Sequence, residues 1–146
     1  MKKFLFLLFV ILSLNAISTV TYESIPPYPW FQDISIVGHD YNSPCVILKT
    51  GESLDMTLLT FAVDHVITTC KTTIYFVSDI TPYPVLGGWV IHEDAYSVAY
   101  QEIKYTIYDI VEPDGRWVLG AVTMHIYMED QYGEVIGAAK IPMLIL

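Results

Sequence analysis

The stretch that most constrains the fold runs from residue 122 to residue 129, where apolar and polar side chains alternate without a break. A period of two is the pattern of a β-strand with one buried face, whereas a helix would spread the same apolar side chains around its axis. The buried face of this strand would carry Val122, Met124, Ile126 and Met128. This segment therefore forms a strand whose apolar face is part of the core.

Other strand-forming stretches follow one another closely. Residues 66–77 consist almost wholly of β-branched and aromatic residues, and Ile74 and Phe76 share one face with Cys70. Residues 98–111 predict a long strand. Its apolar positions are Ile103, Tyr105 and Ile107.

Shorter strands are predicted at residues 33–38, 53–63 and 89–97, the last as an edge strand, and a return strand from residue 135. Turn residues separate them: the sequence EPDG at 112–115, the sequence DQYGE at 130–134, and a loop at 78–88 with two prolines and two glycines. No convincing amphipathic helix follows residue 18. This organisation predicts an all-β, antiparallel two-sheet sandwich.

The first 18 residues have the features of a secretory signal peptide. Two lysines precede an unbroken apolar run from Phe4 to Leu12, and small residues stand at Ala16 and Ser18. The alternative is a membrane anchor, but a span needs about 20 apolar residues. We therefore expect cleavage near Ser18, a single domain over residues 19–146, no stable membrane insertion, and a location outside the cell or in the endo-lysosomal lumen.

The chain is acidic, with 16 Asp and Glu against 7 Lys and Arg, for a net charge of −9. Cleavage after residue 18 would remove Lys2 and Lys3 and make the charge more negative still. No basic stripe exists to contact phosphates, so nucleic acid is excluded as a partner. Anionic membrane surfaces are disfavoured for the same reason.

The chain has two cysteines, Cys45 and Cys70. In an oxidising compartment, with no third thiol to compete, they predict one disulfide. Two free thiols or an intermolecular bond are the alternatives.

The order of these parts resembles a known family. A signal peptide, a Thr-rich strand, an apolar loop rich in proline, EPDG, and above all the sequence VTMHIYMEDQYGEVIGAAKI at 122–141 are similar to the ML domains, which are secreted lipid-recognition proteins that include sterol carriers and phospholipid transfer proteins. The chain differs from that family in its small number of cysteines. Gly137 and Ala138 stand where a cysteine would be expected.

The resemblance implies an immunoglobulin-like sandwich that admits a sterol or an acyl chain between its sheets. The cavity would be lined by Ile74, Phe76, Ile103, Tyr105, Ile107, Val122, Met124, Ile126 and Met128. The entrance would be rimmed by Tyr83, Val85, Leu86 and Trp89. Methionines adapt to irregular ligands, and aromatic rings suit a boundary that is apolar on one side and wet on the other.

The same residues are compatible with an ordinary closed core. In that case the protein would be a secreted sandwich for protein recognition, in adhesion or host modulation, and the apolar loop would dock a protein partner. The sequence is therefore compatible with two functions. The protein is either a lipid-binding or lipid-transfer protein, or a protein-recognition module.

Neither catalysis nor a metal is predicted. His39, His65, His92 and His125 are scattered singly, with no second ligand at a helical or hairpin spacing. No nucleophile elbow, phosphate loop, zinc motif or dinucleotide fingerprint occurs. We expect a protein that is not an enzyme and has no cofactor.

Overall fold

The computed structural model describes residues 17–78 and 85–146, with only the backbone described at 17, 18 and 85. Its regular elements are β1 (Ile17–Thr19), β2 (Glu23–Ser24), β3 (Asp33–Val37), β4 (Val46–Leu48), β5 (Ser53–Leu59), β6 (Ile67–Val77), β7 (Val85–Ser97), β8 (Lys104–Ile110), β9 (Gly120–Glu129) and β10 (Val135–Ile145). Over these two ranges no helix is long and apolar enough to cross a membrane.

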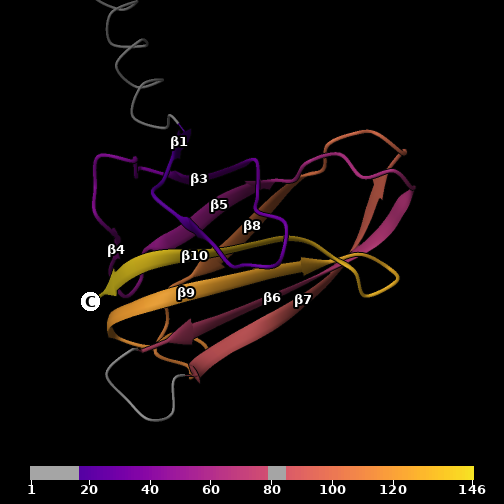
Figure 1. Cartoon of the computed structure of the whole chain (residues 1–146). Helices are drawn as coiled ribbons and strands as arrows, with labels where there is room; N and C mark the ends of the chain where they lie inside the picture. The colour runs from indigo at the N-terminus through magenta and orange to yellow at the C-terminus, as the bar shows by residue number, and fades with distance from the viewer. Residues whose placement is uncertain (1–16, 79–84) are drawn as a thin grey trace, which may run out of the picture.

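The strands form two sheets that face each other (Figure 1). The smaller sheet has the order β1-β3-β5-β8, and the larger has the order β2-β10-β9-β6-β7, with β4 alongside the end of β10. All pairings are antiparallel except that of β4 with β10. The predicted all-β, antiparallel two-sheet sandwich is confirmed.

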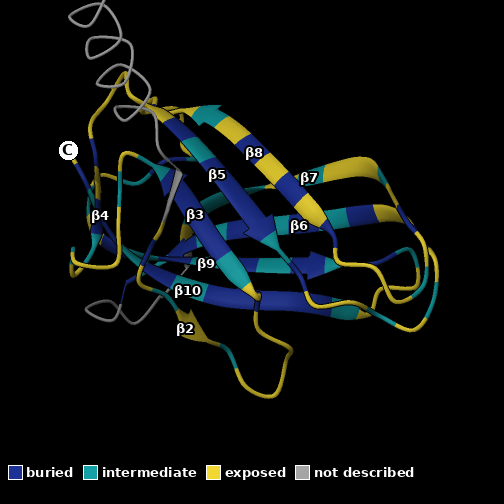
Figure 2. Ribbon diagram, turned by 90° about the horizontal axis from the view of Figure 1, so that it is seen from above, coloured by how far each residue is buried: buried dark blue, intermediate teal, exposed yellow. Residues whose placement is uncertain are grey.

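The core lies between the sheets. Figure 2 shows buried residues in dark blue on the strands of both layers, and exposed residues mainly in the connections and along β8. Along β9 every second residue from Val122 to Met128 is buried, as the alternation predicts. The inner faces of the two sheets merge into one apolar cluster.

Strand β7 begins inside the predicted loop at 78–88, so that prediction is wrong from Val85 onward. Two glycines explain the error. Gly88 pairs with Tyr75 and has a φ of +156°, and a Cβ there would collide with the Ile74 carbonyl. The glycines therefore permit close approach of the backbone rather than ending the strand. Residues 79–84 of the predicted loop lie outside the described residues.

Strand β8 is shorter than predicted, because residues 98–103 form the connection between the sheets instead of a strand. Tyr100 adopts a φ of +64°, and its N–H donates to the Val63 carbonyl. The Ile103 N–H donates to Thr60 Oγ1 at 3.2 Å. The chain must cross here from β7 in one sheet to β8 in the other, and alternation along the sequence does not reveal such a crossing.

The predicted signal peptide ends within a strand. Residues 1–16 lie outside the described residues, while Ile17 and Ser18 belong to β1, which pairs with β3. Cleavage after residue 18 stays a prediction, as does a domain that starts at residue 19.

The predicted disulfide is wrong, since Cys45 and Cys70 are both free. Cys45 precedes β4 and lines a hollow with Val77, at the far end of β6. Cys70 lies seven residues before Val77 in the same strand, a separation of roughly 23 Å at about 3.3 Å per residue. A disulfide needs Cα atoms within about 7 Å. The two thiols therefore lie at opposite ends of the larger sheet.

A hydrogen-bonded cap joins the β5–β6 connection to the β9–β10 hairpin. Asp130 Oδ1 accepts the N–H groups of Tyr132 and Glu134 at 2.8 and 2.9 Å, which shapes the turn. Asp130 Oδ2 lies 2.8 Å from His65 Nε2, and His65 Nδ1 lies 3.0 Å from Asp64 Oδ1. An ionised carboxylate at each nitrogen favours the protonated form of this imidazole.

The pKa values follow this geometry. Hydrogen bonds to Asp64 and then to Asp130 raise the pKa of His65. Burial acts to raise the pKa of Asp130, but the hydrogen bonds from Glu134 N and His65 outweigh it, and this pKa is lowered.

One side of the sandwich is closed by the backbone of residues 29–32. Ala138 N–H on β10 donates to the Pro29 carbonyl at 2.8 Å, and Gln32 N–H donates to the Leu59 carbonyl on β5 at 2.7 Å. This segment therefore joins the two sheets and inserts the fully buried Phe31 between them. The ring of Phe31 lies over Gly137, where an added Cβ would come within 2.5 Å of it.

We predict that Gly137→Ala destabilises the fold by about 1–3 kcal/mol, because the Phe31 ring has no room to retreat from the new methyl group. Chemical unfolding would measure the change. Phe31→Leu in the same chain should recover part of the loss, so that the double variant is more stable than the sum of the two single changes. Strictly additive changes would contradict the proposed contact.

The His65 cap predicts a pH dependence of definite sign. A histidine with a raised pKa stabilises the native state fully below its ordinary pKa of about 6.5 and loses this contribution as pH rises through the raised value. His65→Gln should therefore destabilise the protein more at pH 5.5 than at pH 8, as measured by urea unfolding at both values.

His39 provides a control of opposite sign, because burial lowers its pKa. The contribution of a histidine held neutral is unfavourable below its ordinary pKa and disappears above it. His39→Gln should accordingly be better tolerated at pH 5.5 than at pH 8. Equal pH trends for the two variants would show that His65 does not bridge the two loops.

Candidate functional site

The structure places the nine predicted cavity residues together between the sheets. On the larger sheet, register pairs Ile74 with Ile126 and Phe76 with Met124. On the smaller sheet, Tyr105 and Ile107 face inward from β8, and Ile103 lies just before it. The full set from both sheets belongs to one buried cluster: Ile74, Phe76, Ile103, Tyr105, Ile107, Val122, Met124, Ile126 and Met128.

These residues form a packed core in this structure. Five of them expose none of their surface: Ile74, Phe76, Met124, Ile126 and Met128. Their role in lining a cavity therefore stays a prediction, and any guest would have to displace side chains. Four buried methionines make the core easier to rearrange than one built of branched residues. They are Met56, Met124, Met128 and Met143.

An aromatic cluster covers this core beside the edge strand β7. The ring of Trp117 lies 5.1 Å from that of Trp89 and 5.5 Å from that of Phe76, with tilted planes. Trp117 is buried and Trp89 is partly exposed. The turn at 112–115 holds Trp117 here, because Gly87 allows the Gly115 carbonyl to approach β7 where a Cβ would collide with it.

Two of the four predicted entrance residues, Leu86 and Trp89, have described side chains, and they lie beside the same hollow. Trp89 joins the aromatic cluster, and it also lines a shallow hollow together with the exposed Leu86, Tyr75 and Val90. Val85 begins β7, but its side chain lies outside the described residues, as does the whole of Tyr83. The sequence missed Trp117. Its one signal was that this is the only aromatic residue in the connection 111–119.

Three polar groups reach the core along the β7–β8 side. Burial raises the pKa of the Tyr105 phenol, and a hydrogen bond with Glu93 of β7 raises it further. At the other end of β8, Asp109 Oδ2 is buried and accepts no hydrogen bond, with Arg116 Nη1 at 3.7 Å. The buried Nε1 of Trp117 also has no hydrogen-bond partner.

The two sides of the sandwich are therefore closed differently. Residues 29–32 close one side through backbone hydrogen bonds to both sheets. On the other side, β7 pairs with β6 and β8 pairs with β5, and in the described ranges no strand pairing joins β7 to β8. Within the described ranges, side-chain contacts rather than a backbone ladder hold β7 and β8 together on this side.

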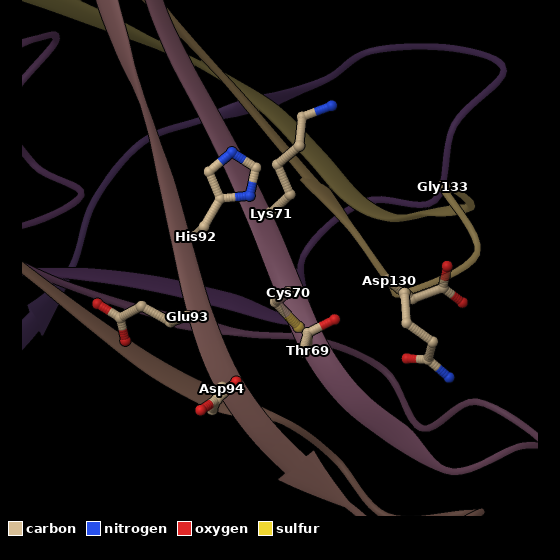
Figure 3. Close-up of a pocket in the computed structure, with 9 residues that line it drawn as sticks. Thr69, Cys70, Lys71, His92, Glu93, Asp94, Asp130 and Gly133 are labelled. Carbon is tan, nitrogen blue, oxygen red and sulfur yellow. The ribbon is translucent and has the colours of Figure 1, made fainter.

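A separate pocket of about 520 Å³ opens where β6 and β7 meet the β9–β10 hairpin (Figure 3). Its lining is polar, with Lys71 paired to Glu129 and His92 beside Lys71. Burial, followed by the charge of Asp130, raises the pKa of Cys70 to about 11. The Cys70 thiol is therefore protonated at neutral pH and is a poor nucleophile.

His65, Asp130 and Glu134 offer ligand atoms within 4.8 Å of one another, a grouping that the sequence did not reveal because 65 residues separate His65 from Asp130. Both Asp130 oxygens already accept hydrogen bonds that shape the cap. These residues therefore belong to the hydrogen-bonded cap of the fold.

No protein-family model matches this chain, and no curated protein matches it. Solved structures do match it over most of its length, and two of them are described here. The Niemann-Pick type C2 protein from Japanese carpenter ant is 16% identical, with a TM-score of 0.66, and the match covers 87% of this chain and 100% of that one.

Chicken MD-1 complexed with lipid IVa is 10% identical, with a TM-score of 0.54, over 88% of this chain and 96% of that one. At such identities the likeness concerns the fold. The chain therefore has the immunoglobulin-like sandwich fold of the Niemann-Pick type C2 protein and MD-1, and its resemblance to the ML domains is confirmed at that level.

Proposed function

We propose that this protein binds a lipid, with a sterol or an acyl chain held between the two sheets, and acts by shielding it from water without making or breaking a covalent bond. The observation that carries this proposal is the unequal closure of the sandwich. On the β7–β8 side of the methionine-rich core, no strand pairing in the described ranges joins the two sheets, and the side chains that cover it are largely aromatic.

Binding of a lipid in the core is physically plausible for two reasons. An apolar guest gains free energy at about 25 cal/mol per Å² of surface removed from water, so even one acyl chain can offset some loss of internal packing. Flexible methionines can re-pack around it. Separating β7 from β8 breaks no backbone ladder, whereas opening the other side would break the hydrogen bonds of Pro29 and Gln32.

The comparison supports the same function. Chicken MD-1, which shares the fold, is complexed with lipid IVa. The acidic balance of the chain favours neutral or zwitterionic lipids over anionic ones. Export through the predicted signal peptide would deliver such a carrier outside the cell or into the endo-lysosomal lumen.

A second function, protein recognition, is favoured by one surface feature. Trp30 and Phe61 are 56% and 47% exposed, and their rings contact each other edge to face at 6.2 Å. Exposed aromatic pairs of this kind are enriched at protein interfaces. A protein that carries no lipid would favour this second function.

The first test is native mass spectrometry of the protein secreted by cells that express the full chain, followed by solvent extraction and lipid analysis. We expect one discrete lipid at near-stoichiometric occupancy. An empty protein that also takes up neither a fluorescent sterol nor a fluorescent phospholipid would rule out lipid binding.

A variant tests where the lipid sits. Met124→Trp fills the space between the sheets, and we expect it to abolish lipid occupancy while overpacking lowers the unfolding free energy by about 1–3 kcal/mol. Thr123→Trp places an indole on the opposite face of β9 and should keep the lipid. Retention of lipid by a folded Met124→Trp protein would place the binding site elsewhere.

A further inference from the structure

The buried indole of Trp117 carries a donor that the protein itself does not use. Trp117 is 3% exposed, and its Nε1 has no hydrogen-bond partner among the residues that the structure describes. Buried tryptophans ordinarily find an acceptor for this N–H, and an unmade bond costs folding free energy. The neighbouring rings of Phe76 and Trp89 offer no acceptor atom in the plane of the indole.

A second polar atom, beside Arg116 and so close to Trp117 in the chain, also lacks a hydrogen bond among the described residues. Asp109 lies on the inward face of β8, in the same alternation as Tyr105 and Ile107. Its Oδ1 accepts the Ile110 N–H at 2.8 Å, while its buried Oδ2 accepts no hydrogen bond. Arg116 Nη1 forms an ion pair with this oxygen at 3.7 Å, beyond hydrogen-bond distance.

The local structure holds both atoms in place. Asp114 Oδ1 accepts the Arg116 N–H at 3.0 Å, and Asp114 Oδ2 accepts from Arg116 Nε at 2.5 Å. The guanidinium is thereby drawn toward Asp114. The approach of Gly115 to Gly87 fixes the same turn against β7, and with it the indole of Trp117.

We propose that Trp117 and Asp109 select the ligand, by offering one hydrogen-bond donor and one acceptor to a hydroxyl group of the bound lipid. This inference rests on the proposed lipid-binding function. A hydroxyl accepts from the Trp117 N–H and donates to Asp109 Oδ2, which satisfies both buried atoms. The preferred ligand is thus a neutral lipid with a hydroxyl beside its apolar body.

Two related classes of lipid are disfavoured by the same atoms. A plain hydrocarbon leaves both polar atoms unsatisfied, as they are in the free protein. A carboxylate brings a negative charge close to Asp109, and like charges at short range repel. The site therefore discriminates by the chemistry of one terminal group rather than by chain length.

The test uses three probes of equal chain length: hexadecan-1-ol, hexadecane and hexadecanoate. Their dissociation constants are measured by displacement of N-phenyl-1-naphthylamine from the secreted protein. We expect hexadecan-1-ol to bind most tightly. Trp117→Phe keeps an aromatic ring but removes the N–H, and it should weaken hexadecan-1-ol binding by about 3- to 10-fold while leaving hexadecane binding unchanged.

Trp89→Phe is the matched control, since Trp89 belongs to the same aromatic cluster. It should change the affinities for hexadecan-1-ol and hexadecane by similar factors. Asp109→Asn removes the negative charge and should strengthen hexadecanoate binding relative to hexadecan-1-ol.

The outcomes separate the two proposals. If the wild-type protein binds none of the three probes, lipid binding itself fails. If it binds them and Trp117→Phe alters hexadecan-1-ol and hexadecane equally, or alters neither, lipid binding stands and the role of Trp117 is overturned.

One measurement does not depend on the affinity of any variant. In wild-type protein, the indole N–H resonance of Trp117 should shift on addition of hexadecan-1-ol but not of hexadecane. The absence of that shift when hexadecan-1-ol is bound would overturn the inference.

Discussion

The antiparallel register between β6 and β9 is the interaction on which the rest of the structure depends. It sets Ile74 opposite Ile126 and Phe76 opposite Met124, so that both strands present an apolar face to the core. A slip of one residue would turn the polar faces of these strands inward. The outer face fixes the same register, because the Tyr75 ring stacks on those of its neighbours on β9 at 5.1 and 5.8 Å.

The two sides of the sandwich are closed in different ways, and one of them is easier to open than the other. Pro29 and Gln32 tie the two sheets together through backbone hydrogen bonds, with Phe31 wedged between them over Gly137. On the opposite side, β7 and β8 are joined through side chains such as Glu93 and Tyr105. Hydrogen-bonded backbone resists separation, whereas contacts between side chains can be remade around a guest.

The polar atoms on the β7–β8 side are energetically unfavourable in a closed, apolar core. Among the described residues, Asp109 Oδ2 and the buried indole N–H of Trp117 make no hydrogen bond, and buried polar groups of this kind cost folding free energy. A fold built for stability alone would place apolar side chains there. Strain and unsatisfied groups of this kind are characteristic of binding sites, where a ligand completes the hydrogen bonding.

The sequence by itself determined the class of the fold and the composition of its core. Alternation along residues 122–129 and the β-branched run at 66–77 depend only on local chemistry, because a strand turns successive side chains to opposite faces whatever surrounds it. For this reason the inward positions of Ile74, Phe76, Met124 and their neighbours could be predicted.

Only the tertiary structure decided which segments meet. Cys45 and Cys70 are the two cysteines of the chain, yet they lie at opposite ends of a sheet, and Gly87 and Gly88 continue a strand where the sequence predicted a loop. His65 meets Asp130, and Trp117 meets Phe76, across long separations in the chain. Local propensity carries no information about such distant partners, because strand order and register decide them. Strand order also explains why side chains close one side of the core, and why polar atoms without hydrogen bonds lie there.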